Sequence, residues 1–277
     1  MDRRIRLQIF LLMLIWTFII SPPIAQAEKR VALILGNSAY IHSSPLKNPV
    51  NDAKALSESF TQLGFYVIRG IDQTKSGMDN QIQLFSKHVE GAELAVFFYA
   101  GHGMQLNFEN YLVPIDFDPQ AGNNLISQLI SLDNILHELE KEKRISIIFL
   151  DACRDNPLAN KLASNLESGR SLLIDKNRGV KVVGQGLAEV EGKAGTLIAY
   201  ATQPGNVASD GDGDNSPFTE ALLRYLREPG LEIRDMLSYV RVRVMKKTSD
   251  QQIPWDHSSL IKKVYFKKKK TRFAPPP

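Results

Sequence analysis

The residues best suited to chemistry in this chain are one thiol and one imidazole, each placed after an apolar run. Cys153 is the single cysteine of the 277 residues and closely follows the run at 145–150. His102 closely follows a second apolar run, at 94–98. A thiol becomes an effective nucleophile when a nearby base accepts its proton or a cation lowers its pKa. The pair therefore predicts nucleophilic catalysis with Cys153 as nucleophile and His102 as base.

The position of the two residues at strand ends supports this interpretation. In open α/β sheets, reactive groups collect in the crevice beyond the carboxyl ends of the strands. Taken alone, a cysteine after a strand can be a small buried hydrophobe, and a Gly-His-Gly sequence can be only a turn. Together, at matching strand ends, we expect them to form a catalytic dyad.

The elements needed to position this pair alternate along the chain, which predicts an α/β fold. Strands that are apolar on both faces, separated by amphipathic helices, are typical of a mostly parallel sheet covered on both faces. A final strand near 259–266 is expected at an edge. The other strands are expected at 30–36, 65–69, 94–99, 145–150 and 196–201, and helices at 49–63, 76–89, 132–141, 217–226 and 233–246.

The first 27 residues have the pattern of a secretory signal. Three arginines precede an apolar stretch at 7–20, and Ala25-Gln-Ala27 is a small-residue cleavage site. We expect cleavage after Ala27, export to a periplasm and no stable membrane association afterwards. An uncleaved segment anchored in the inner membrane is the alternative. Removing residues 1–27 takes away three arginines and one aspartate, so the formal net charge falls from +4 to +2.

Cysteine usage and the ends of the domain restrict the function further. A single cysteine excludes an internal disulfide and any zinc site built on several cysteines. Residues 28–266 are expected to form one domain, in which 156–193 has no sustained periodicity and reads as a flexible linker. The basic, Pro-rich tail at 267–277 has no interleaved aromatic platform for bases, so no nucleic-acid partner is expected.

Several motifs together resemble the caspase-like cysteine peptidases, of the bacterial metacaspase and orthocaspase kind. The resemblance covers essentially residues 28–266, and a histidine about 50 residues before the cysteine is the caspase spacing. The matching strings are Arg30-Val-Ala-Leu-Ile-Leu-Gly-Asn-Ser-Ala-Tyr40, Leu46-Lys-Asn-Pro-Val-Asn-Asp-Ala53, Tyr99-Ala-Gly-His-Gly103, Asp151-Ala-Cys-Arg-Asp155, and the stretch from Gly195 to Thr219.

This resemblance implies a thiol protease, an endopeptidase working through a thioester acyl-enzyme, on a three-layer fold with a six-stranded sheet. It implies an oxyanion hole made by the backbone N–H groups of Gly103 and Cys153. It also implies that the segment at 156–193 separates large and small subunit regions. We expect self-cleavage there after Arg170 or Arg178, in exposed backbone.

The resemblance also implies that Asp52 and Asp151 lie at the base of the pocket for the residue before the scissile bond (P1). Two carboxylates held close repel each other, so a cation between them is favoured. We therefore expect peptide or protein substrates with Arg or Lys at P1 and no cleavage after Asp. The plainer interpretations are a helix N-terminal acid for Asp52, favoured by the macrodipole, and a loop-orienting acid for Asp151.

No cofactor or metal is expected. The string Asp210-Gly-Asp-Gly-Asp214 suggests calcium, but Asn215 and Ala221 replace the glycine and glutamate that the full calcium loop requires. We therefore favour an acidic loop beside the cleft, with calcium activation as the minor alternative. Two other functions stay open: a catalytically idle relative that binds peptides or partners, and an α/β binding module with a fortuitous cysteine. The sequence does not determine the oligomeric state.

Overall fold

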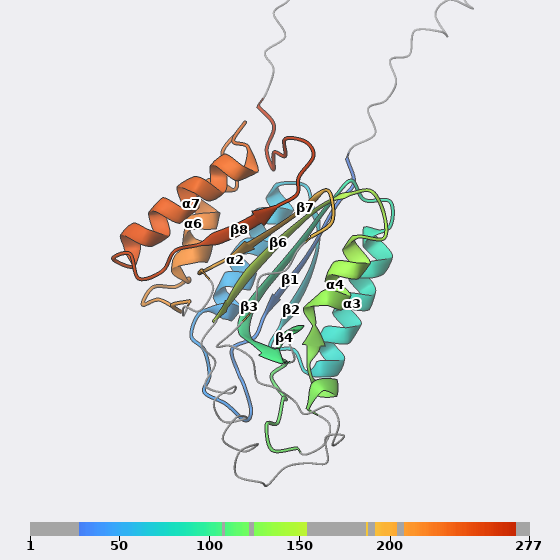
Figure 1. The fold of residues 1–277 in the computed structure, drawn as a ribbon, viewed down its shortest axis with the longest axis vertical. Coiled ribbons are helices and arrows are strands. Elements are labelled where there is room, and N and C mark those ends of the chain that lie inside the picture. Colours follow the sequence, from blue (N-terminus) through green and yellow to red (C-terminus); the bar gives the residue numbers. More distant parts are fainter. Residues whose placement is uncertain are drawn as a thin grey trace, which may run out of the picture.

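A twisted sheet with helices on both faces forms the body of the protein (Figure 1). The computed structural model describes residues 28–106, 109–121, 125–153, 187, 192–203 and 208–269. The signal-like segment, Arg170, Arg178 and the end of the tail lie outside these residues. In the described part of the chain, no helix is long and apolar enough to cross a membrane.

The main sheet has the strand order β2-β1-β3-β6-β7-β8. All neighbouring pairs are parallel except β7 and β8. The expected mostly parallel, six-stranded sheet is therefore confirmed. A small antiparallel pair, β4 and β5, extends from β3. The strands are β1 Arg30–Gly36, β2 Tyr66–Ile71, β3 Leu94–Leu106, β4 Glu109–Leu112, β5 Ile130–Ser131, β6 Ile145–Cys153, β7 Thr196–Tyr200 and β8 Trp255–Ser258.

Two hydrophobic clusters, one on each face of the sheet, hold the three layers together. One face is covered by α2 (Pro49–Gln62), α6 (Pro217–Tyr225) and α7 (Ile233–Lys247), and the other by α3 (Lys75–Val89) and α4 (Leu132–Leu139) (Figure 1). Alternate side chains of each central strand enter opposite clusters, as the period of two requires. Thus Phe98 packs under α2 and α6, whereas Phe97 packs under α3 and α4.

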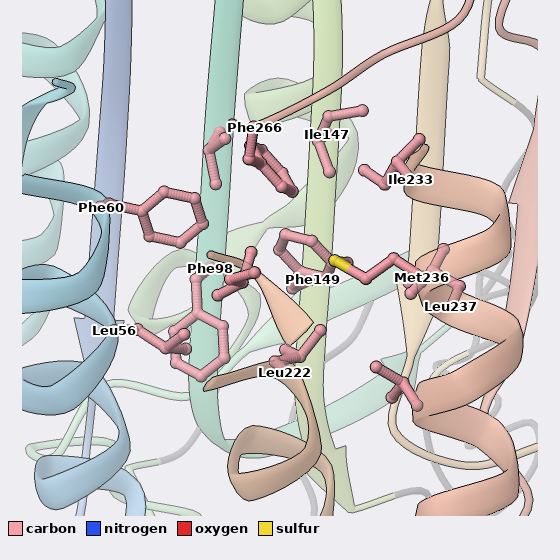
Figure 2. Packing of buried hydrophobic residues seen from close by; sticks show 14 of the residues in the cluster. Leu56, Phe60, Phe98, Ile147, Phe149, Leu222, Ile233, Met236, Leu237 and Phe266 are labelled. Carbon is pink, nitrogen blue, oxygen red and sulfur yellow. The ribbon is translucent and has the colours of Figure 1, made fainter. Parts of the chain in front are cut away.

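The prediction of a strand near 259–266 was wrong, because the strand lies just before it, at β8. The alternation of apolar residues in this segment serves a different purpose. Val264 and Phe266 enter the cluster beneath α7, and the Val264 carbonyl accepts the N–H of Ile233 at 3.0 Å. The Phe266 ring lies 5.5 Å from that of Phe60 (Figure 2). The C-terminal segment therefore closes one face of the core.

Candidate active site

The pairing of β3 and β6 places the predicted nucleophile and base on neighbouring strands. In this parallel pair, His102 stands opposite Cys153. Neighbouring strands lie about 4.8 Å apart, so the two backbones are in immediate proximity. Both strands run past their outer neighbours, since β1 ends where Gly36 pairs with Ala100, and β7 ends where Tyr200 pairs with Leu150.

The strand expected at 94–99 is longer than the sequence suggested, and the plainer interpretation of Gly-His-Gly as only a turn does not hold. The strand β3 continues through it to Leu106. The glycines permit close packing inside an extended strand. A side-chain carbon at Gly103 would lie 3.1 Å from Leu187 and 3.3 Å from Ala152. Its backbone N–H faces β6, the side of Cys153, because successive residues of a strand direct these groups to opposite sides.

The imidazole of His102 is buried and oriented by a backbone carbonyl. Its Nε2 lies 3.2 Å from the carbonyl oxygen of Ser44. Because a carbonyl can only accept, Nε2 carries the proton and Nδ1 keeps its lone pair. Nδ1 has no hydrogen-bond partner among the described residues. No residue type pointed to Ser44, since any residue could supply this carbonyl.

The protonation state of His102 suits a general base. Burial lowers the pKa of His102, against the opposing influence of the Ser44 carbonyl and of the Asp210 carboxylate. The imidazole is therefore neutral near pH 7 and can accept a proton at Nδ1. The other histidines lie elsewhere: His42 in an exposed loop, His88 on α3, His137 on α4 and His257 on β8.

Asp52 and Asp151, which the family resemblance placed in one pocket, both accept hydrogen bonds from Ser216. The Ser216 backbone N–H donates to Asp52 Oδ1 at 3.1 Å, and its hydroxyl donates to Asp151 Oδ2. Asn215 Nδ2 also donates to Asp52 at 2.8 Å, and Thr219 Oγ1 donates to Asp151 at 3.0 Å. Both carboxylates are buried, with exposed fractions of 1% and 8%. The first turns of α2 and α6 and the end of β6 thus converge.

A third carboxylate, Asp210, lies at the same pocket and was not assigned to it from the sequence. The pocket measures about 20 Å³ and is lined by Leu46, Pro49, Asp52, Ala100, Gly101, Asp151, Ala208, Ser209, Asp210 and Ser216. The Asp210 side chain accepts the N–H of Lys47 at 2.5 Å and that of Asn48 at 3.2 Å. The sequence signal was an acidic loop, which we interpreted as a cleft-side loop or a calcium site. In the described residues, no group of three or more potential ligands is arranged to hold a metal.

The carboxyl groups of Asp52, Asp151 and Asp210 lie close enough for the charge of one to raise the pKa of another. Burial, joined by repulsion from Asp151, raises the pKa of Asp52 to about 8. Burial likewise raises the pKa of Asp151 to about 6, against the stabilising hydrogen bonds of Ser216 and Thr219. The Asp210 carboxylate raises both. Asp52 and Asp151 therefore retain a proton near neutral pH, and a positive group entering the pocket would replace that proton.

The fold and this site define the class of protein. The chain belongs to the caspase family of cysteine peptidases, since the Caspase domain model matches residues 29–265. Mucosa-associated lymphoid tissue lymphoma translocation protein 1 from Homo sapiens and its homolog from Mus musculus are each 34% identical over 131 residues. These matches cover 46% of this chain and 15% of each relative, so the chain spans less than a fifth of their length.

A solved structure shows the same fold over nearly the whole chain. The crystal structure of Caspase-1 from Spodoptera frugiperda superposes with a TM-score of 0.61 and 18% sequence identity. The match covers 89% of this chain and 92% of that one. At this identity the likeness bears on the fold alone, and it confirms the three-layer, caspase-like architecture.

Proposed function

We propose that this protein is an exported cysteine endopeptidase of the metacaspase and orthocaspase type that cleaves after Arg or Lys. The observation that carries the proposal is the register of His102 opposite Cys153, with the lone pair of Nδ1 left unpaired among the described residues. Membership of a cysteine-peptidase family supports the same chemistry. The signal-like sequence at 1–27 supports export to a periplasm.

In the proposed mechanism, His102 Nδ1 accepts the thiol proton of Cys153 as the sulfur attacks the scissile carbonyl carbon. The oxyanion that forms is stabilised by the backbone N–H groups of Gly103 and Cys153. The imidazolium then gives its proton to the leaving amine, and the C–N bond breaks to leave a thioester. Water, deprotonated by the same nitrogen, hydrolyses the thioester and restores the thiol.

Ser44 contributes by fixing the tautomer of this base. Its carbonyl holds the Nε2 proton through every step, so Nδ1 alone exchanges protons with the reacting groups. The carbonyl also bears partial negative charge, which stabilises the imidazolium as it forms. His102 and Cys153 therefore work together with the backbone carbonyl of Ser44. A dyad inferred from side chains alone does not include this third group.

The carboxylates Asp52, Asp151 and Asp210 account for the proposed preference for a basic P1 residue. A guanidinium can meet carboxylates with a bidentate fork, and an ammonium acts as a point charge. An aspartate at P1 would add a further negative charge to a site that already holds a proton because its acids repel each other. The pocket in this structure has room for about one water molecule. The residues that line it must therefore move apart to admit a basic side chain.

The test compares peptide hydrolysis with alkylation of the thiol by iodoacetamide. Cys153→Ala and His102→Ala should each abolish hydrolysis of Arg substrates, and His102→Ala should also slow alkylation. Asp151→Asn should cut turnover of Arg substrates by about 10²-fold or more while leaving alkylation near wild type. Exposed Asp235 in the first turn of α7 supplies the control Asp235→Asn, which should change neither. Full activity of His102→Ala, or a preference for Asp at P1, would refute the proposal.

Self-processing by a single cut is proposed for the segment at 156–193, after Arg170 or Arg178. Both have the P1 chemistry that the acidic pocket selects. Intact-mass analysis of the wild type beside Cys153→Ala should show two fragments in the first and one chain in the second. Identical masses would show that the protein does not cut itself.

A further inference from the structure

The backbone of His102 lies where the main sheet no longer provides a neighbour on one side. The last residue of β1, Gly36, pairs with Ala100, and the next N–H, of Asn37, donates to the Ala100 carbonyl at 3.0 Å. His102 is two residues further on, so its N–H and C=O face the same side as those of Ala100. The C=O accepts the N–H of Val113 at 3.0 Å, whereas the N–H has no partner in the described part of the main sheet. Because the residue is buried, an unpaired N–H here would be costly.

Two tyrosine hydroxyls bind the His102 backbone on the side where β1 has ended. The N–H of His102 donates to the hydroxyl of Tyr40 at 2.7 Å, and the hydroxyl of Tyr99 donates to the carbonyl of His102, also at 2.7 Å. The two hydroxyls lie 3.3 Å apart. The Tyr40 ring also lies against the imidazole, with centroids 4.3 Å apart. The pair therefore contacts the N–H, the C=O and the ring of one residue.

Gly101 makes room for this arrangement. Its φ is +151°, and a side-chain carbon there would lie 2.6 Å from the hydroxyl oxygens of both Tyr40 and Tyr99. Atoms at that distance overlap, so any larger residue would push the hydroxyls away from the His102 backbone. The glycine just before the histidine is thus required by the hydroxyl pair as well as by its own backbone conformation.

The segment that carries Tyr40 is itself fixed. Asp72, just after β2, accepts the N–H groups of Ser38 and Ala39 at 2.7 and 2.9 Å. This loop also carries Ser44, whose carbonyl orients Nε2 of His102. The backbone of the histidine and its ring are therefore held by a single loop that is anchored on the next strand of the sheet.

We propose that Tyr40 and Tyr99 are positioning residues that fix the backbone and ring of His102 so that Nδ1 reaches Cys153. This inference rests on the proposed function, in which His102 is the general base. The hydroxyls touch no substrate atom and act through the histidine. Burial raises the pKa of Tyr99, so its phenol remains a hydrogen-bond donor at any working pH.

Tyr40→Phe and Tyr99→Phe test the proposal, because each keeps the ring and removes only the hydroxyl. The matched control is Tyr111→Phe on β4, a buried tyrosine whose hydroxyl donates to Glu109. We would measure kcat and KM on an Arg substrate, the pH profile of kcat, and the rate of iodoacetamide alkylation, well below each variant's Tm. If Tyr40→Phe fails to fold, Tyr99→Phe still tests the pair, because the His102 carbonyl keeps the N–H of Val113 at 3.0 Å.

A misplaced base should lower kcat by about 10- to 100-fold with KM within about twofold. Alkylation should slow by a similar factor at neutral pH, and the pH at which kcat reaches half its maximum should shift. The double variant should lose little more than the worse single variant, since the hydroxyls act as one unit. Tyr111→Phe should keep kcat within about twofold.

Two outcomes would overturn the positioning role: wild-type kcat in both single variants, or a rise in KM with kcat unchanged. His102→Ala, measured in the same series, separates this failure from failure of the proposed function. If His102→Ala is inactive and the phenylalanine variants are fully active, only the role of the tyrosines is refuted. If His102→Ala retains activity, the proposed base itself is wrong.

Discussion

Replacing Asp52 with Asn should stabilise the protein at neutral and alkaline pH, although it removes a residue proposed to bind substrate. Asparagine has nearly the same shape, and its Oδ1 can still accept the Ser216 N–H that Asp52 accepts at 3.1 Å. The substitution therefore removes one buried negative charge with little change in packing. It isolates the electrostatic cost of holding Asp52 beside Asp151.

The size of the stabilisation expected for Asp52→Asn follows from the raised pKa of Asp52. Burial and repulsion from Asp151 raise the pKa of Asp52 from 3.8 to about 8. One pKa unit corresponds to about 1.4 kcal/mol, so the free energy of unfolding loses at most about 6 kcal/mol between pH 4 and pH 8. Part of this belongs to the pair, because Asp151 titrates with Asp52. We expect Asp52→Asn to recover about 2–5 kcal/mol at pH 8.

Whether the free energy of unfolding rises or falls with pH depends on whether the unfolded or the folded state holds more protons. Between about pH 4 and pH 8, folded Asp52 keeps a proton that the unfolded chain has released. Stability contributed by this group is thus present at low pH and lost as pH rises through the folded pKa. Wild-type stability should fall over this window, and the Asp52→Asn curve should be flatter. Near pH 4 the two proteins should differ by less than about 1 kcal/mol.

Thermal unfolding followed by circular dichroism from pH 4 to pH 8 would measure this, in a Cys153→Ala background to prevent self-cleavage. For a domain of this size, about 1 kcal/mol shifts Tm by roughly 2–4 °C, so we expect a rise of about 5–15 °C at pH 8. Asp235→Asn, which changes an exposed acid in the first turn of α7, should lower Tm slightly or not at all. If Asp52→Asn also lowered Tm at pH 8, Asp52 would be an ordinary helix N-terminal acid, worth about 0.3–1 kcal/mol.

Three further results should follow. The inhibition constant of benzamidine, a guanidinium-like cation, should fall about tenfold per pH unit between about pH 6 and pH 8, because binding displaces the one proton that Asp52 and Asp151 hold in this range; a flat profile in competition assays would contradict this. Phe266→Ala should lower the free energy of unfolding in urea by about 3–5 kcal/mol, since it leaves a cavity beside Phe60, Phe65 and Phe149. Ser216→Ala should cost about 1–2 kcal/mol, because Ser216 caps α6, and should raise KM for Arg substrates while hardly changing iodoacetamide alkylation.

The sequence predicted most of the sheet, because its strands are apolar on both faces and their residues must be buried. The strand at Arg30–Gly36 and the convergence of His102 with Cys153 both follow from that pattern. The position of the last strand was missed by a few residues. Val264 and Phe266 alternate as in a strand, yet they pack from a non-strand segment into the cluster shared by α2, α6 and α7, and periodicity alone cannot distinguish the two uses.

The sequence did not predict the roles of Ser44 and Asp210 in the site, because these roles depend on backbone groups that residue type does not reveal. The carbonyl that orients His102 belongs to Ser44, and a backbone carbonyl leaves no mark in residue type. Asp210 was visible as an acid, but its place depends on hydrogen bonds from the backbone of Lys47 and Asn48, more than 160 positions away in the chain. Such long-range contacts require the fold before they can be inferred.

One segment, residues 37–52, joins all parts of the candidate site. It supplies the hydroxyl of Tyr40 to the His102 backbone, the carbonyl of Ser44 to the imidazole, and the carboxylate of Asp52 to the acidic pocket. Its backbone also holds Asp210. Since Asp72 fixes the start of this segment, a shift of that loop would displace the base and the specificity pocket together. A perturbation there should therefore change kcat and KM in concert, whereas the tyrosine hydroxyls should change kcat alone.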